Sequence, residues 1–462
     1  MKIKEDTPMS QTQSKSKSMD MTEGSIFKLL IAFSIPLLMG NIFQQLYNTV
    51  DSLVVGNYVG KEALAAVGST GPVINTLITF FNGVSLGATV IISRYFGAHD
   101  DVKLHSAIET TLALTFLSGI FCTVLGICAA PWLLRFMDTP EDVMPAASTY
   151  LRIYFAGVSG LLLYNMGSGI LRAVGDTKRP LYFLILSSIM NIVLDLVFVI
   201  VFNMGIAGVA YATIISQFVS AILILILLTK SKENYRFVWK DLRIDLPIVK
   251  QICSVGLPAG LQQAITSFSN VYVQSYINGF GSSCMAGWSS YSKIDMFVML
   301  PMMSVAQATT TFVSQNIGAG NLERAKKGTN TSLAMSAAIS LGIAVVLWML
   351  APQFASLFSQ DVEVVYFCTL FLRQNIFFLA TCCLTQVYSG TLRGVGNSTT
   401  PMILMLISYV AFRQVYLFIV KQVCYTPNLV GFGYPAGWMV CALLTTLYYH
   451  FSGWDKKLKT SK

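Results

Sequence analysis

The sequence predicts an all-α membrane protein of twelve transmembrane helices, arranged as two parallel six-helix lobes. Only 11% of the 462 residues are charged and 54% are hydrophobic, whereas an ordinary soluble domain has about 25% charged residues. A surface with so few charges must largely face lipid. Backbone groups in lipid have to be satisfied within their own segment, so the apolar runs are predicted to be helices.

The second half of the chain repeats the first at one constant offset. Segment 169–176 (GILRAVGD) ends one long apolar stretch, and segment 390–397 (GTLRGVGN) ends another. The offset that carries the first segment onto the second also carries Gly97 onto Gly318. A duplicated membrane unit places a cavity between two similar lobes, as in many secondary transporters.

Twelve apolar segments are long enough to cross a bilayer, which needs about 20 residues of helix. They are 26–55, 63–92, 105–130, 143–171, 180–202, 206–229, 247–278, 284–314, 328–350, 362–391, 401–423 and 433–453. Prolines fall within the first two helices of each half, at Pro36, Pro72, Pro258 and Pro301. A proline inside a helix removes a hydrogen bond and allows a kink.

The segments between the helices complete the organisation. Residues 1–24 are polar and rich in Ser, Lys and Gln, so we expect a disordered cytoplasmic tail. The first lobe covers 25–229, a basic cytoplasmic linker covers 230–246, the second lobe covers 247–453, and a short tail covers 454–462. Because each half has six spans, both halves enter the membrane in the same direction.

Basic residues set the predicted orientation. Most of the 31 Lys and Arg residues lie in the two tails and the even-numbered connections, so the positive-inside rule puts both termini in the cytoplasm. The net charge of +9 is therefore explained by the orientation of the chain in the membrane, and we expect no nucleic-acid partner. We expect a monomeric, multi-pass protein of the bacterial inner (plasma) membrane, with the lipid bilayer as its partner.

Enzymatic and metal-dependent functions find no support in the sequence. The three histidines, His99, His105 and His450, all lie near cytoplasmic helix ends. The nine cysteines are scattered without metal-ligand spacing, and neither a Walker motif nor a nucleophile–base pair is visible. We expect no enzyme activity, no cofactor and no structural metal.

Two acids inside predicted helices are the main functional candidates. Asp51 lies in helix 1 and Asp195 in helix 5, one turn after Asn191. Burying a carboxylate in a membrane costs several kcal/mol unless it is paired, hydrated or protonated. The two acids could share a proton or bind one Na⁺; alternatively, each acid hydrogen-bonds a neighbouring helix and only fixes packing. In the repeat they correspond to Tyr272 and Tyr416, so only the first half carries them.

Other polar residues suggest a cavity. Candidates for its lining are Gln44, Tyr47, Asn48, Gln263, Asn270, Tyr291 and Asp295. The alternative for the amides is interhelical hydrogen bonding. Lys293 and Asp295 could form a polar wall, or a structural charge network with Arg413.

Four segments resemble motifs of the multidrug and toxic compound extrusion (MATE) transporters: 50–56 (VDSLVVG), 171–180 (LRAVGDTKRP), 191–195 (NIVLD) and 205–213 (GIAGVAYAT). The resemblance covers roughly residues 25–453. The helix 5 motif usually continues with Pro after the Asp, whereas Leu196 follows here.

The resemblance implies a V-shaped pair of lobes and antiport, by alternating access, of a cationic amphipathic drug or toxic organic compound against H⁺ or Na⁺. The DNA-damage-inducible subgroup has its cation site in the first lobe, at positions that match Asp51, Asn165, Asn191, Asp195 and Thr213 here. Another subgroup has acids on helices 7 and 10, and the lack of mid-helix acids there favours the first.

Two other functions remain open. A flippase for a lipid-linked or phospholipid-like substrate, from the same wider fold superfamily, would need basic cavity residues, for which Lys293 and Arg413 are candidates. A membrane scaffold or receptor would show no effect of acid-to-amide changes on any flux.

Overall fold

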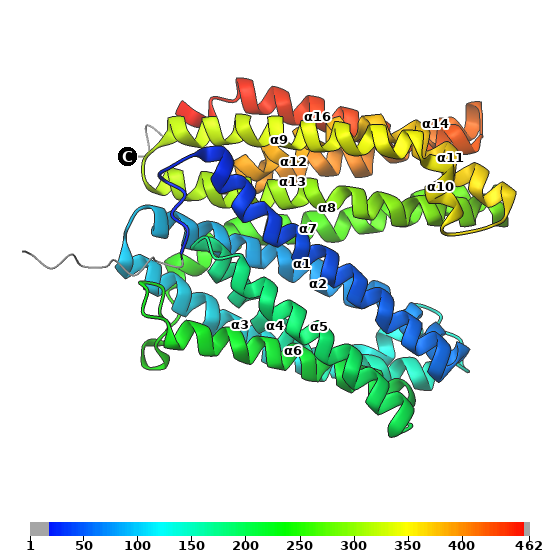
Figure 1. The fold of residues 1–462 in the computed structure, drawn as a ribbon, viewed down its shortest axis with the longest axis horizontal. Helices are drawn as coiled ribbons and strands as arrows, with labels where there is room; N and C mark the ends of the chain where they lie inside the picture. Colours follow the sequence, from blue (N-terminus) through cyan, green and yellow to red (C-terminus); the bar gives the residue numbers. More distant parts are fainter. Residues whose placement is uncertain (1–17, 457–462) are drawn as a thin grey trace, which may run out of the picture.

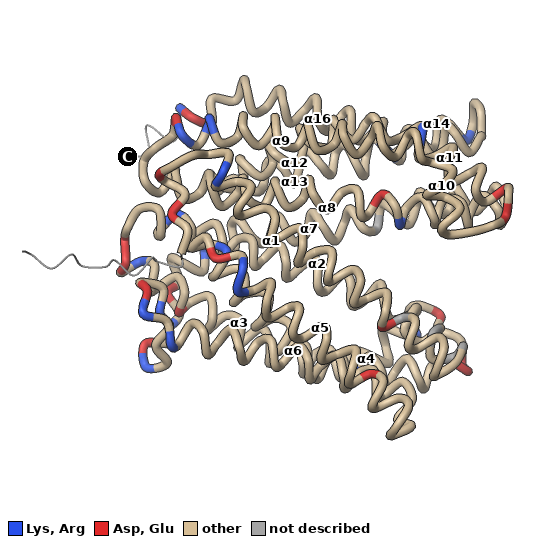
Figure 2. The backbone as a smooth tube through the Cα atoms, viewed as in Figure 1, with Lys and Arg blue, Asp and Glu red and all other residues tan. Residues whose placement is uncertain are grey.

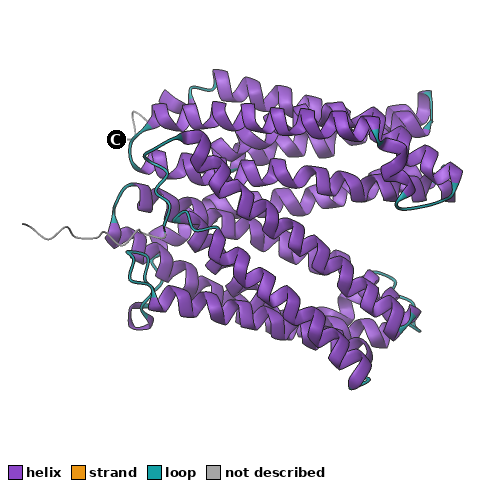
Figure 3. Cartoon of the chain, in the orientation of Figure 1, coloured by secondary structure: helices purple, strands orange, loops and turns teal. Residues whose placement is uncertain are grey.

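The computed structural model describes residues 18–456, and every regular element within that range is a helix (Figure 3). The N-lobe and the linker contain α1 (Ile26–Val54), η1 (Val55–Val59), α2 (Lys61–Gly97), α3 (Asp101–Phe136), α4 (Met144–Ala173), α5 (Lys178–Leu196), η2 (Val197–Val201), α6 (Gly205–Lys230) and η3 (Trp239–Asp241). The C-lobe contains α7 (Leu246–Asn278), α8 (Ser282–Gly318), α9 (Leu322–Met349), α10 (Ala351–Ser356), α11 (Val362–Asn375), η4 (Ile376–Phe378), α12 (Leu379–Gly394), α13 (Thr399–Leu406), η5 (Ile407–Phe412), α14 (Arg413–Val423), α15 (Pro427–Gly431) and α16 (Gly433–Phe451).

Eleven helical stretches of the described chain are long and apolar enough to cross a membrane, and they coincide with eleven of the twelve predicted segments. The remaining segment is α7, a helix of 33 residues. Polar side chains, including Gln262, Gln263 and Asn270, reduce the hydropathy of α7. Its length suits a span, and its polar residues point to a place among other helices rather than against lipid.

The two lobes form a V (Figure 1), which confirms the predicted architecture. They converge at the end of the molecule that carries both tails and the linker, here called the tail end, and diverge toward the opposite, far end. Lys and Arg gather at the tail end (Figure 2).

Matching hydrogen bonds confirm that the lobes are copies. Thr89 Oγ1 donates to the Gly169 carbonyl at 3.2 Å, which ties α2 to α4. Thr310 Oγ1 donates to the Gly390 carbonyl at 3.1 Å, which ties α8 to α12. The offset of the sequence repeat relates the two donors and also the two acceptors, so the repeat in the sequence is also a repeat of contacts.

The lobes touch most closely where α2 crosses α7. A Cβ atom on Gly83 would overlap the backbone of Gly260, and one on Gly87 would overlap that of Gly256. The two backbones therefore pack against each other without intervening side chains. This contact lies in the half of each helix nearer the tail end.

Helix α1 crosses from one lobe to the other (Figure 1). Near the tail end, Leu30 and Phe33 are buried against Phe312 of α8 and Met335 of α9, both in the C-lobe. At the far end, Val55 of the adjoining η1 is buried within the N-lobe. The first helix thus belongs to both lobes in packing terms.

Residues 18–24, which belong to the tail predicted to be disordered over 1–24, make specific contacts with both lobes, and residues 1–17 lie outside the described chain. Met21 is fully buried and packs with Leu30 and Phe33. The Met19 amide donates to the Val174 carbonyl at 3.2 Å. The composition of the segment is polar overall, but its two methionines pack against apolar side chains. Its backbone also forms hydrogen bonds with other parts of the chain.

Candidate functional site

Helices α1 and α5 bring Asp51 and Asp195 together near the far end of the N-lobe. The two carboxyl groups lie within hydrogen-bonding reach of each other. Asp195 and Asn191 share one face of α5 and are 0% and 1% exposed, and Asp51 is 9% exposed. All three side chains are therefore buried, and the two acids contact each other.

In the part of the chain that the structure describes, three of the four carboxyl oxygens of the acid pair are buried without a hydrogen-bond partner. Among residues 18–456, neither carboxyl oxygen of Asp195 and neither side-chain polar atom of Asn191 has a hydrogen-bond partner. All four ion pairs found in that range involve other acids: Asp100, Asp176, Glu109 and Asp455. Two carboxylates are both acceptors, so their contact is favourable only when a proton or a cation lies between them.

Three tyrosines surround the acid pair. Tyr47 of α1 and Tyr150 and Tyr154 of α4 all lie close enough to Asp51 to interact with its charge. Tyr154 also contacts Gln217 of α6. Sequence reasoning assigned Tyr47 to the cavity but missed the α4 pair. The available signal was the one-turn spacing of Tyr150 and Tyr154, which places both on one helix face.

Two further predicted residues lie on neighbouring helices. Thr213 of α6 is buried and donates its hydroxyl to the Val209 carbonyl of its own helix at 3.0 Å. Its oxygen therefore keeps lone pairs with which it could bind a cation. Asn165 of α4 is half-buried, and its backbone carbonyl accepts a hydrogen bond from Ser85 Oγ at 3.0 Å.

The helix that carries Asp195 changes its winding directly after the acid. Helix α5 ends at Leu196, and the π-helix η2 follows over Val197–Val201. Leu196 thus continues the helix where the resembling motif has proline. Short π-helical turns inside α-helices are frequent at functional sites, and this one widens the helix beside the acid pair.

The predicted cavity residues divide between the lobes. Tyr47 belongs to the acid site of the N-lobe, and Gln44 and Asn48 lie on the same helix, half-buried and exposed. On α7, Gln263 is half-buried and the Asn270 side chain accepts from Arg413 at 2.9 Å.

The last two cavity candidates lie on α8. Tyr291 is buried and its ring lies 5.0 Å from that of Trp288. Asp295, one turn further along α8, is half-buried and lies on the same helix face as Tyr291. The residues predicted to line the cavity therefore lie at two separate places, one in each lobe.

The C-lobe has an arginine where the N-lobe has its acid pair. Helices α7 and α14 correspond to α1 and the α5 region in the repeat, and Arg413 of α14 donates to Ser269 Oγ and Asn270 Oδ1 of α7, at 2.6 and 2.9 Å. Its guanidinium also lies 4.8 Å from the centre of the Tyr434 ring, a cation–π distance. Lys293 instead lies over the Phe358 ring, so the contacts found for the two basic groups belong to separate networks.

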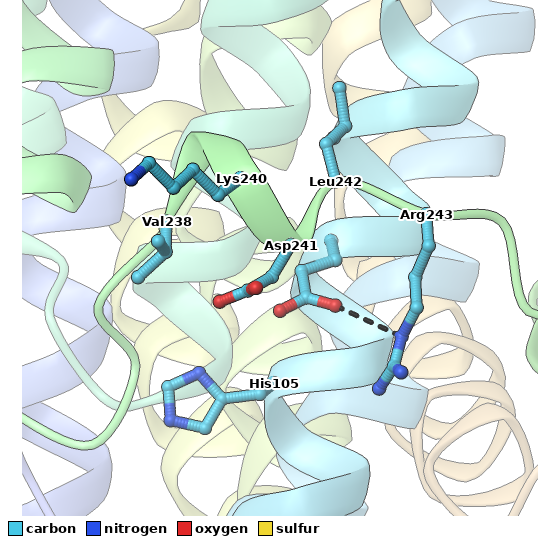
Figure 4. A pocket seen from close by; sticks show the side chains of 7 residues that line it. His105, Val238, Lys240, Asp241, Leu242 and Arg243 are labelled. Carbon is cyan, nitrogen blue, oxygen red and sulfur yellow. Dashed lines mark ion pairs between the residues drawn. The ribbon is translucent and has the colours of Figure 1, made fainter.

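A pocket at the tail end lies far from the acids along the helices. It is lined by α3 and the linker, with Glu109, Lys240, Asp241 and Arg243 among its side chains (Figure 4). Arg243 Nε lies 3.3 Å from Glu109 Oε2, and this ion pair fastens the linker to the N-lobe. In the described chain no group of three or more His, Cys, Asp or Glu residues is suited to hold a metal ion.

Comparison with known proteins adds a family context. The sequence profile of the MatE family matches residues 36–197 and 258–419, one copy in each lobe. The chain is 30% identical over 454 residues to the probable multidrug resistance protein YoeA of Bacillus subtilis (strain 168), with 96% of each protein covered.

Two further similarities span nearly the whole chain. It is 31% identical over 452 residues to the probable multidrug resistance protein YpnP of Bacillus subtilis (strain 168), covering 96% of this chain and 100% of YpnP. A solved structure described as the outward-facing conformation of a multidrug resistance MATE family transporter of the MOP superfamily superimposes with a TM-score of 0.90. It is 28% identical and covers 96% of this chain and 99% of that one.

Proposed function

Because this chain belongs to the MatE family of membrane transporters, we propose that it exports cationic amphipathic compounds in exchange for H⁺ or Na⁺. Asp51 and Asp195 are the coupling site, with Asn191, Thr213 and Asn165 as supporting ligands. The function needs no cofactor other than the coupling ion.

The observation that carries this proposal is the contact between two buried carboxyl groups from different helices. Asp51 and Asp195 lie within reach of each other, and both oxygens of Asp195 lack a protein donor among the residues described. Binding of a proton or of Na⁺ would convert repulsion between α1 and α5 into attraction. A site of this kind can bias a conformational equilibrium when it binds the ion unequally in the two states.

The substrate would bind between the lobes and in their interiors. Gln44, Tyr47 and Asn48 of α1 would line the N-lobe side, and Gln263, Asn270, Tyr291 and Asp295 of α7 and α8 the C-lobe side. Aromatic faces and a carboxylate suit an amphipathic organic cation. The names of YoeA and YpnP as probable multidrug resistance proteins support a drug-like substrate for this chain.

Alternating access gives the direction of transport. The basic residues at the tail end (Figure 2) support a cytoplasmic location for both termini in the bacterial inner membrane. With that orientation, lobes that are joined at the tail end would represent an outward-facing state. Rocking of the lobes would open the tail end for uptake of substrate by a single protein chain acting as a monomer.

The decisive experiment is efflux of a fluorescent organic cation from vesicles with pH and Na⁺ gradients imposed separately. We expect one gradient alone to drive efflux, and Asp51→Asn or Asp195→Asn to lower gradient-driven efflux by at least about tenfold, because an amide cannot carry the coupling proton or charge. Asp142→Asn, in an exposed connection, is the matched control. Full activity of both site variants would refute the coupling site.

The flippase alternative has weaker support. Arg413 is 2% exposed and its guanidinium already binds Ser269 and Asn270, which leaves Lys293 as the exposed basic candidate. Transport of an anionic lipid analogue, with no transport of organic cations, would favour the flippase.

A further inference from the structure

Among the hydrogen bonds that join the tail ends of the lobes, two are donated by side chains at equivalent positions of the internal repeat. Arg94 of α2 donates through Nη2 to the Val395 carbonyl of the C-lobe at 2.7 Å. Gln315 of α8 donates through Nε2 to the Ala173 carbonyl of the N-lobe at 2.9 Å. Arg94 and Gln315 occupy equivalent positions in the two repeats, so corresponding side chains reach across the interface in opposite directions.

Corresponding glycines make this double crossing possible. A Cβ atom on Gly97 would overlap the backbone of Gln315, and one on Gly318 would overlap the backbone of Arg94. Gly97 and Gly318 are also equivalent positions in the repeat. The backbones of α2 and α8 can therefore approach closely enough for each reaching side chain to find its carbonyl.

The symmetry is broken by the difference between arginine and glutamine. A guanidinium has donors only, whereas a carboxamide also has an acceptor. That acceptor, Gln315 Oε1, takes a hydrogen bond from the Met21 amide at 2.8 Å. The position where an exact repeat would have a second arginine is thus where the amino-terminal segment docks.

The C-lobe holds residues 18–24 by several bonds. The Met21 carbonyl accepts from Asn316 Nδ2 at 3.1 Å and from Arg324 Nε at 3.3 Å. Arg324 Nη2 also donates to the carbonyls of Glu23 and Gly24, at 2.7 and 2.8 Å. The guanidinium of Arg324 further lies 5.5 Å from the centre of the Phe312 ring.

Among the bonds of residues 19–24, one reaches the N-lobe, from the Met19 amide to the Val174 carbonyl. Met19 lies so close to Gly175, which has a φ of +86°, that a Cβ atom on this glycine would overlap the Met19 backbone. When the lobes separate, a segment with one hydrogen bond to one lobe and several to the other will detach from the lobe that holds it by the single bond.

We propose that residues 18–24 are a latch that travels with the C-lobe and closes the tail end by seating on Val174–Gly175 of the N-lobe. Opening the tail end breaks the Met19–Val174 and Gln315–Ala173 bonds together, while Arg324 keeps the latch on the C-lobe. This proposal rests on the proposed transport function. Within the transport cycle, the latch would set how readily the inward-open state forms.

Hydrogen exchange of the full-length protein in nanodiscs, without substrate or gradient, tests the latch. Arg324→Ala removes its strongest hold, and Lys327→Ala removes the same charge from an exposed neighbouring position on α9. We expect about tenfold faster amide exchange in Arg324→Ala over 18–30, and faster exchange in the tail-end halves of α2 and α8 as the closed state loses population. Lys327→Ala should match the unmodified protein.

A second pair of variants addresses the broken symmetry. Gln315→Met keeps the volume but removes the acceptor for Met21 and the donor for Ala173, and we expect it to accelerate exchange in the same regions. Gln262→Met is its control, because Gln262 is also buried and its side chain bonds to Met405 and Arg393, both in the C-lobe.

Each outcome decides the question. Faster exchange of residues 18–30 with unchanged exchange in α2 and α8 would make the segment a passive cover and overturn the latch, as would unchanged exchange throughout or an equal response to the control variants. The latch would stand if exchange behaves as expected while the efflux assay fails, and in that case only the proposed substrate transport would fall.

Discussion

The first and fifth helices of each lobe meet through polar side chains, but the two lobes use opposite chemistry there. In the N-lobe, Asp51 and Asp195 present acceptors to each other. In the C-lobe, Arg413 presents donors to the Ser269 hydroxyl and the Asn270 amide oxygen. The C-lobe arrangement pairs donors with acceptors, whereas the contact between the two N-lobe carboxyl groups is favourable only with a proton or a cation between them. Under the proposed coupling, ion binding would act on the N-lobe while the C-lobe stays fixed.

Asn191 should be dispensable for folding and needed for coupling. Its amide is 1% exposed and unpaired among the residues described, and a buried polar group without a partner costs about 1–3 kcal/mol. We expect Asn191→Leu to unfold at an equal or higher temperature, yet to lose at least about tenfold in gradient-driven efflux. Thermal unfolding and vesicle efflux measure the two effects, and parallel loss of both would mean that Asn191 is structural.

The carboxyl-terminal segment should loosen in acid. The hydrogen bond from Lys326, at 2.7 Å, lowers the pKa of Asp455 below its ordinary value. A lowered pKa stabilises the folded state above the carboxyl group's unfolded pKa, and this contribution is lost as pH falls through the folded pKa. Both side chains are partly exposed, so the effect should stay within about 1 kcal/mol.

The acid effect can be measured by hydrogen exchange over residues 449–456, corrected for the intrinsic pH dependence of exchange. Lowering the pH should increase exchange there in the unmodified protein. The Asp455→Asn variant should exchange at a rate that no longer depends on this titration, and an identical pH response of the two proteins would contradict the assignment.

At the scale of elements, the close packing of α2 on α7 makes glycine a requirement at particular turns only. Gly83 faces the backbone of Gly260, whereas a Cβ atom on Gly68, in the same helix, would meet no heavy atom of another helix within 4 Å. The same substitution should therefore have opposite effects at two sites on one helix.

We expect Gly83→Ala to destabilise the protein by about 1–3 kcal/mol, because the methyl group forces the two backbones apart. Gly68→Ala should instead stabilise α2 by about 0.5–1 kcal/mol through its better helix propensity. Thermal unfolding of the two variants in the same detergent provides the comparison, and a similar shift in both would show that the α2–α7 contact is less tight than described.

Hydropathy and the repeat were enough to predict where the helices lie, because each membrane span follows from a local run of apolar residues. They were not enough to predict that α1 packs on α8 and α9 near the tail end, because an apolar face does not reveal which apolar partner covers it. The contacts of residues 18–24 could not be predicted from the sequence for a related reason. Met19 and Met21 are held by Val174 and Gln315, which lie far along the chain, and local composition does not encode such partners.

The candidate site was predicted in part. Asp51 and Asp195 stood out because acids are expensive in a membrane span, and the structure brings them together. Tyr150 and Tyr154 were missed, because tyrosines are common in membrane helices and only proximity to Asp51 distinguishes these two.

At the scale of the whole molecule, the asymmetric charge distribution predicts the orientation in the membrane. Lys and Arg gather at the end that carries both termini, which should retain that end in the cytoplasm. A fluorescent protein fused after Lys462 should therefore fold and fluoresce in cells. Alkaline phosphatase fused at the same place should be inactive, because its disulfides do not form in the cytoplasm. Active phosphatase would show that this end lies outside the cytoplasm and would contradict the assigned orientation.

The crossing of α1 between the lobes also bears on how the chain is made. Helix α1 leaves the ribosome before the C-lobe is made, yet its tail-end half is covered by Phe312 and Met335, which are synthesised only after all of the N-lobe. Met21 and Gln315, which form a hydrogen bond, are 294 positions apart. During translation, Leu30 and Phe33 can gain these contacts only once α8 and α9 have been made, so α1 is inserted before its partners and reaches its final place after them.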